Sequence, residues 1–150
     1  HDLVHAAQAA ALAKARPGVA YEAGHQAAVE TLTEGLLRLG LLKGTLEQAI
    51  RDGHYKRFYR HKTGHWLGLD VHDVGDYRID GHSRLLEAGM VFTIEPGLYV
   101  SPDDKSVAAK WRGIGIRIED DVVVTADGHR VLTGKLARSA DEIEALMSAR

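Results

Sequence analysis

The sequence predicts a single α+β domain in which helices come first and mostly antiparallel strands follow. Apolar residues recur at helical spacing through the first 50 positions, whereas from Tyr55 onward glycines separate short β-rich runs. Amphipathic helices in series must bury their apolar stripes, and the following sheet offers a surface for them. We therefore expect helices packed on a mostly antiparallel sheet.

Three helices are expected in the first third of the chain. The stripe of the first consists of Leu3, Val4, Ala7 and Ala11. Pro17-Gly18 ends this helix. The second begins near Tyr21 and ends at Gly40, with the stripe Val29, Leu32, Leu36 and Leu39. A capping box over residues 45–48 opens a short third helix that fades by Gly53.

Short strands and one closing helix are expected in the rest of the chain. The β-rich runs cover residues 91–94, 114–118 and 122–125. Residues 126–129 have the composition of a hairpin turn that leads into Val131. A second capping box, over residues 139–142, opens a helix through Ile143 and Met147.

Composition excludes several classes of protein. The 150 residues include no cysteine, so disulfide frameworks, thiolate metal sites and cysteine nucleophiles are ruled out. A net charge of −2 suggests no nucleic-acid partner. No apolar run approaches the roughly 20 residues of a membrane span, and no signal peptide opens the chain. We expect no membrane partner and a cytoplasmic location.

One glycine-rich segment could carry chemistry. It holds three of the nine histidines, His61, His65 and His72. A zinc-binding helix would need glutamate where Lys62 stands, and Gly64 and Gly68 disfavour any helix there. The composition instead suits a strand entering a tight turn that approaches a ligand. The alternative is three unrelated, partly buried histidines.

Two glutamates stand where predicted strands end. Glu95 follows the run 91–94 and precedes Pro96-Gly97. Alternation in the next strand places Glu119 on the same face as Arg117. That polar face is either solvent-exposed or lines a metal or substrate site, and periodicity alone leaves both readings open.

Imidazole and carboxylate ligands together indicate a kind of metal. One imidazole and two carboxylates suit Mn²⁺, Co²⁺, Fe²⁺ or Zn²⁺. Carboxylates from different strands could bridge two ions, a geometry that activates water.

Three motifs, taken in order, resemble the pita-bread metallopeptidases. They are HKTGHWLGLDVHDVG at 61–75, EPGLY at 95–99 and GIGIRIEDD at 113–121. The resemblance runs over essentially all 150 residues. It implies the C-terminal part of a pita-bread fold, in its Xaa-Pro-cleaving branch. Such enzymes hydrolyse the bond between a residue and a following proline with two divalent cations; Mn²⁺ is favoured, with Co²⁺ or Zn²⁺ as alternatives.

The resemblance also implies a ligand set. His65 would be a terminal metal ligand, and Glu119 would bridge both ions. Glu95 would ligate one ion and serve as proton acceptor and donor for a metal-bridging hydroxide.

Other residues would act on the substrate. By the same resemblance, His72 would steady the scissile carbonyl and its developing oxyanion. His61 and Arg117 would line the pocket for the proline and orient the metal ligands, with Tyr99 behind them.

The length of one connection between strands distinguishes two kinds of enzyme within the family. The stretch from Ser101 to Trp111 is short, which resembles the bacterial Xaa-Pro aminopeptidases; many Xaa-Pro dipeptidases (prolidases) carry a longer insertion. The dipeptidase is therefore the alternative. A non-catalytic peptide-binding module is a lower alternative, because such relatives have typically lost ligands.

The family pattern needs two more ligands, both aspartates upstream of the opening helices. Asp70, Asp73 and Asp76 are better explained as turn residues. The chain also begins with His1 rather than methionine. We therefore expect residues 1–150 to be the C-terminal portion of a catalytic domain whose first half and N-terminal domain are absent. Such a chain would bind at most one ion weakly and have little activity; it would pair with its missing half or self-associate.

Overall fold

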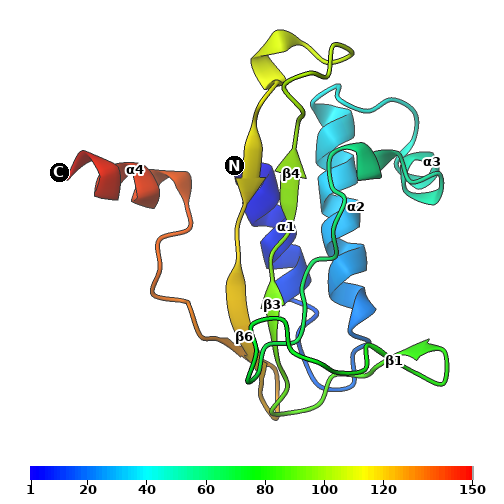
Figure 1. Ribbon diagram of the computed structural model, residues 1–150, viewed down its shortest axis with the longest axis vertical. Helices are drawn as coiled ribbons and strands as arrows, with labels where there is room; N and C mark the ends of the chain where they lie inside the picture. The colour runs from blue at the N-terminus through cyan, green and yellow to red at the C-terminus, as the bar shows by residue number, and fades with distance from the viewer. Residues whose placement is uncertain (150) are drawn as a thin grey trace.

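Two long helices lie beside a narrow ladder of strands in the computed structural model, which describes residues 1–149 (Figure 1). Helix α1 spans Asp2–Leu12 and α2 spans Glu22–Arg38. Helix α3 (Leu46–Arg51) and the 3₁₀ turn η1 (His54–Arg57) follow. The predicted capping box of α3 is confirmed, since Thr45 Oγ1 accepts from the Gln48 N–H at 3.2 Å.

The strands are all antiparallel, as predicted. Strand β3 (Val91–Ile94) pairs with β6 (Asp120–Val124), which pairs with β7 (His129–Val131) across the expected hairpin. Strand β4 (Gly97–Tyr99) pairs with β5 (Gly115–Arg117). A small hairpin of β1 (Arg78–Ile79) and β2 (His82–Ser83) stands apart. Strand β6 begins two residues earlier than predicted, because Asp120 pairs with Ile94.

One proline divides this ladder without shifting its register. Ile94 pairs with Asp120 before the break, and Gly97 pairs with Arg117 after it. Pro96 has no N–H to donate, so the ladder is interrupted there. Because the register is the same on both sides, Glu95 stands opposite Glu119 at the interruption.

The glycine-rich segment at residues 61–75, which we call the histidine segment, runs along the edge of β3 that does not pair with β6. The Thr93 N–H donates to the His65 carbonyl at 2.9 Å, and the Leu67 N–H donates to the Val91 carbonyl at 3.1 Å. The Glu95 N–H donates to the Thr63 carbonyl. Residues 63–67 are therefore extended, as the glycines predicted.

The core lies between the helices and one face of β3 and β6. Its buried members include Val4, Ala7, Ala11, Ala28, Leu32, Phe92, Ile94, Val122 and Val124. The predicted stripe of α1 and the first two members of the α2 stripe supply the helical side of this core. Of the remaining predicted members, Leu36 packs in a second cluster with Phe58, and Leu39 is exposed. The opposite face of β3 is left free for polar side chains.

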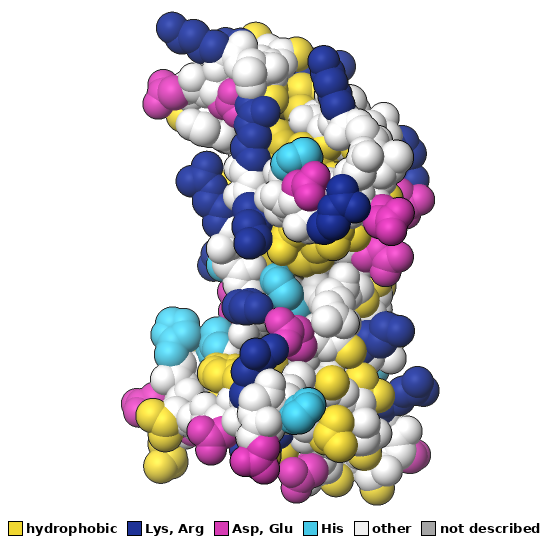
Figure 2. Space-filling view, turned by 90° about the vertical axis from the view of Figure 1, so that its right-hand side faces the viewer, with side chains coloured by type: hydrophobic (Ala, Val, Ile, Leu, Met, Phe, Trp, Pro, Cys, Tyr) yellow, Lys and Arg dark blue, Asp and Glu magenta, His cyan; other side chains and the backbone are white. Residues whose placement is uncertain are grey.

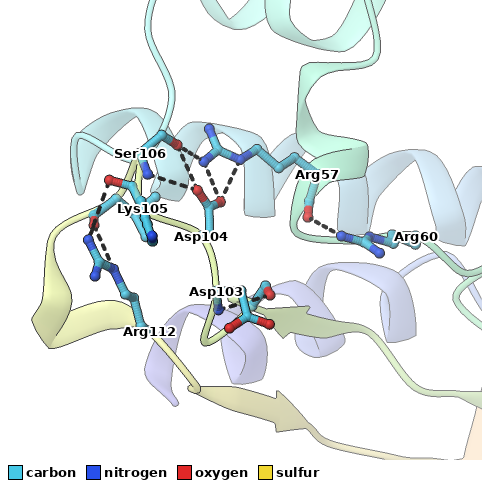
Figure 3. A network of polar contacts seen from close by, with 9 residues as sticks. Arg57, Arg60, Asp103, Asp104, Lys105, Ser106 and Arg112 are labelled. Atoms are coloured by element: carbon cyan, nitrogen blue, oxygen red, sulfur yellow. Dashed lines mark hydrogen bonds and ion pairs between the residues drawn. The ribbon is translucent and has the colours of Figure 1, made fainter.

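The loop between β4 and β5 is fastened to η1 by polar contacts (Figure 3). Arg57 Nε donates to an Asp104 carboxylate oxygen at 2.9 Å, and its guanidinium also contacts Ser106. Arg57 and Ser106 hold the pKa of Asp104 at about 2. Arg112 donates to the Val107 carbonyl at 2.8 Å, which closes the loop on itself.

Helix α4 (Ala140–Ser148) forms as predicted but does not lie on the sheet. Its capping box is present, with Ser139 Oγ accepting from the Glu142 N–H. The helix projects from the body (Figure 1), and its apolar stripe of Ile143, Leu146 and Met147 is exposed. Residues 132–139 carry it away from the core, and none of its residues is buried.

The surface is chemically mixed. On the face shown in Figure 2, acidic, basic and histidine side chains alternate with small hydrophobic patches. Among residues 1–149, no helix has both the length and the apolar character needed to cross a bilayer.

Candidate metal centre

Three ligand-type side chains converge on the free face of the ladder. His65 comes from the extended segment beside β3, Glu95 follows β3, and Glu119 lies between β5 and β6. One ligand atom from each lies within 4.8 Å of the others. His65 Nε2 is 3.3 Å from Glu95 Oε1. The structure thus brings together the three residues that the sequence singled out as metal ligands.

The imidazole of His65 is held in one orientation. Its Nδ1 lies 2.9 Å from the Trp66 carbonyl oxygen. A carbonyl oxygen can only accept, so Nδ1 carries a ring hydrogen, and Nε2 is the ring atom that faces the carboxylates. Nε2 is therefore the atom that this histidine would offer to a metal.

A residue that sequence reasoning missed orients Glu95. Thr93 Oγ1 donates to Glu95 Oε1 at 3.0 Å and accepts from the His65 N–H at 3.1 Å. Thr93 is buried. Its signal was the alternation of β3, which places position 93 on the same face as position 95.

The two carboxylates repel each other. Partial burial of Glu119 raises its pKa, and the charges of Glu95 and Asp121 raise it further. The charges of His65 and Arg117 oppose this rise only in part. A divalent cation would compensate the negative charge, and one imidazole with two carboxylates is a donor set that such ions accept. The residues present therefore fit a divalent metal.

A hydrogen-bonded chain runs from Arg117 to the histidine segment. Arg117 Nε donates to the Tyr99 hydroxyl oxygen at 2.7 Å, and that hydroxyl lies 2.9 Å from His61 Nε2. His61 Nδ1 lies 2.8 Å from the Lys62 carbonyl oxygen, so Nδ1 carries a ring hydrogen and donates to that carbonyl. Arg117 Nη1 also lies 3.7 Å from Glu95 Oε2, which links these hydrogen bonds to the carboxylates.

His72 lies beside the three residues on an exposed loop. The centres of its ring and the His65 ring are 4.3 Å apart. Its side chain is open to solvent, unlike that of His65. An incoming molecule could therefore reach His72 directly.

A second polar cluster that sequence reasoning missed lies at the start of the histidine segment. His25 Nδ1 is 2.8 Å from Thr63 Oγ1, which is 2.6 Å from the Tyr59 hydroxyl. Burial lowers the pKa of His25 to about 4, with help from the charge of Lys62. A cavity of about 390 Å³ adjoins the cluster, but none of the three ligand-type residues lines it.

The chain matches known proteins over most of its length. The description of metallopeptidase family M24 matches residues 1–126. Xaa-Pro aminopeptidase 2 of Streptomyces coelicolor is 48% identical over 149 residues, which cover 99% of this chain and 32% of that protein. The Xaa-Pro aminopeptidase of Escherichia coli is 46% identical over 149 residues, with 99% and 33% covered. The chain thus spans about a third of the length of these relatives.

Solved structures agree with these matches. The Pseudomonas aeruginosa aminopeptidase PepP superposes with a TM-score of 0.97 at 53% identity, over 99% of this chain and 34% of that one. Aminopeptidase P from E. coli with the inhibitor Pro-Leu gives 0.93 at 46% identity, over 99% and 33%. The predicted α+β fold, as the C-terminal part of a pita-bread fold, is confirmed by this likeness.

Proposed function

Because the chain belongs to metallopeptidase family M24, we propose that it forms part of a metal-dependent aminopeptidase that cleaves between an N-terminal residue and a following proline. The observation that carries the proposal is the convergence of His65, Glu95 and Glu119 within 4.8 Å. The names of the relatives support the substrate class. The substrate would be a peptide or dipeptide with proline in second position.

The cofactor would be divalent cations held by His65 Nε2 and the carboxylates of Glu95 and Glu119. Bound there, such ions activate water at neutral pH and polarise the scissile carbonyl. We propose two ions in the whole enzyme, with Mn²⁺ favoured over Co²⁺ or Zn²⁺, and at most one weakly bound by this chain. The remaining ligands would be two aspartates from outside residues 1–150.

Glu95 would accept and return the proton of the attacking water. Oε1 already accepts from Thr93, and Oε2 lies near the guanidinium of Arg117. These contacts fix the orientation of the carboxylate, as a group that accepts and returns a proton at a defined place requires.

His72 and His61 would handle the substrate. The exposed imidazole of His72 would donate to the scissile carbonyl oxygen and stabilise its developing charge. His61 is held by Tyr99 and lies edge-on to Tyr59, with ring centres 5.0 Å apart. That fixed ring would provide a flat apolar surface for the pyrrolidine ring of proline, beside Arg117.

The alternatives differ in specific features. An Xaa-Pro dipeptidase would share the same ligands, but the short β4–β5 loop favours the aminopeptidase. A non-catalytic peptide-binding module is disfavoured because the three ligand residues are all present. A cytoplasmic location and the lack of nucleic-acid and membrane partners stay predictions.

A chimeric enzyme tests the proposed activity. This chain would replace the matching third of the E. coli Xaa-Pro aminopeptidase, to which it is 46% identical. We expect the chimera to cleave Xaa-Pro peptides in Mn²⁺ and to leave matched Xaa-Ala peptides intact. Glu95→Gln should abolish turnover, while Glu87→Gln, an exposed glutamate outside the site, should preserve it.

The opposite result would reject the proposal. A chimera that folds and binds Mn²⁺ but cleaves no Xaa-Pro peptide would show that these residues do not support the reaction. The isolated 150-residue chain should show little turnover in the same assay; turnover near that of the chimera would contradict the need for outside ligands.

A further inference from the structure

The residue after Glu119 is a buried acid on the opposite face of the ladder. The Asp120 side chain is 1% exposed, although it carries a carboxylate. Burying an unpaired carboxylate costs several kcal/mol, so such a group persists only where partners satisfy it. Its partners therefore indicate what holds this part of the strand in place.

Both partners come from one segment, which we call the C-terminal arm, residues 132–139. Thr133 Oγ1 donates to Asp120 Oδ1 at 2.5 Å, and Arg138 donates to Asp120 Oδ2 at 2.5 Å. The arm thus occupies both oxygens of the buried carboxylate.

The arm also holds Asp121, through the backbone N–H and carbonyl of that residue. The Asp121 N–H donates to Thr133 Oγ1 at 3.1 Å, and the Leu132 N–H donates to the Asp121 carbonyl at 2.8 Å. Arg138 is itself fixed by the start of α4, because its N–H donates to Glu142 of the capping box at 3.2 Å.

Glu119 needs such support. It stands opposite Glu95 where the ladder is interrupted, so like charges face each other, and Pro96 provides no N–H for a ladder hydrogen bond at this point. On the C-terminal side of Glu119, however, Asp120 and Asp121 are anchored by the arm. The anchored backbone keeps Glu119 directed at Glu95 and His65 despite the repulsion.

We propose that the C-terminal arm is a positioning element for the metal centre, acting through Asp120 on Glu119, with Thr133 and Arg138 as its positioning residues. This role rests on the proposed metal site. The arm lies beyond residue 126, where the match to the family description ends.

The test is Mn²⁺ affinity of the 150-residue chain, measured by calorimetry well below the unfolding temperature. Thr133→Val and Arg138→Met should weaken binding about 3- to 10-fold, at or below the low end of effects seen for groups that support metal ligands. Thr133→Ser and Arg138→Lys keep the hydroxyl and the charge, and should restore most of the affinity.

Whether Arg138→Met weakens or strengthens Mn²⁺ binding distinguishes a positioning role of Arg138 from a simple effect of its charge. Removing a positive charge near a cation site removes a Coulomb repulsion and so strengthens cation binding. Arg130→Met on β7 removes the same charge at an exposed position and provides this baseline. Weaker binding by Arg138→Met alongside unchanged or tighter binding by Arg130→Met would support the proposal.

Two other outcomes would overturn it. If Thr133→Val and Arg138→Met lower the thermal stability of the metal-free chain but leave Mn²⁺ affinity unchanged, the arm is only structural. If the unaltered chain binds no Mn²⁺, the proposed metal site fails, and the role of the arm fails with it.

Discussion

Glu119 is placed where its own charge is unfavourable in the metal-free chain. Its side chain is exposed, but neighbouring atoms remove part of its hydration; it also faces Glu95 across the ladder, with Asp121 two positions along. Each of these raises the pKa of its carboxyl group. Residues positioned for a ligand commonly lower the stability of the unliganded fold in this way.

Replacing this carboxylate should therefore stabilise the metal-free protein. The pKa of Glu119 is raised above 4.5 in the folded state, so the folded chain binds this proton more tightly than the unfolded chain. The penalty is full above the folded pKa and disappears as pH falls below about 4.5. Glu119→Gln should thus raise stability at pH 7 and change little near pH 3.

Urea unfolding with a chelator present, repeated across this pH range, measures the effect. In the same variant, Mn²⁺ affinity should fall at least about tenfold, since a proposed ligand is lost. A variant that is less stable than the unaltered chain at pH 7 without metal would show that Glu119 contributes favourable contacts instead.

At the scale of elements, the extended histidine segment must approach β3 closely. A Cβ atom at Gly64 would lie 1.8 Å from the Thr93 carbonyl oxygen. That atom belongs to the backbone, which cannot move aside without breaking the pairing with residues 63–67. The glycine therefore permits the hydrogen bonds that place His65 beside Glu95.

Gly64→Ala should lower the free energy of unfolding by at least about 2 kcal/mol, because the clash cannot be relieved locally. It should also weaken Mn²⁺ binding by displacing His65. Gly128→Ala is the matched control, since a Cβ atom there meets nothing within 4 Å. Equal stability of the two variants in thermal unfolding would refute the close approach.

Local signals predicted most of these elements. The two capping boxes, the stripe of α1 and most of the stripe of α2 depend on neighbours in sequence, and these were confirmed. Leu39, the last predicted member of the α2 stripe, lies beyond the end of the helix and is exposed. The contact between His25 and Thr63 joins residues 38 positions apart. It depends on the path of the chain, which periodicity does not encode.

The same limit applies to the site. Sequence motifs singled out His65, Glu95 and Glu119, but their mutual distances depend on a register that continues past Pro96. Thr93 was missed because threonine is common in β-strands, so its presence within an apolar strand indicates no special role. Its role is evident only once the His65 backbone lies beside it.

At the scale of the whole molecule, exposed apolar side chains stand out. Leu69, Val71 and Val74 on the His72 loop are 103%, 68% and 89% exposed. The stripe of α4 adds Leu146 and Met147 at 64% and 71%. Surfaces of this kind favour association.

The isolated chain should accordingly self-associate as concentration rises. Light scattering after size exclusion should show a mass above 16.4 kDa at high concentration. Leu146→Glu should shift the distribution toward monomer, whereas Ala145→Glu adds the same charge off the stripe and should not. A clean monomer at every concentration would contradict the expectation.

The unshifted register across Pro96 has a consequence for how this chain can change in length. Added residues in the loop between β4 and β5 that keep the contact between Arg57 and Asp104 would cost mainly loop entropy, because pairing on either side of the proline sets the opposition of Glu95 and Glu119. One residue added between Gly97 and Tyr99 would instead slip the pairing and turn alternate side chains to the wrong face. Natural or engineered insertions should therefore be tolerated in the loop and excluded from the strands it joins.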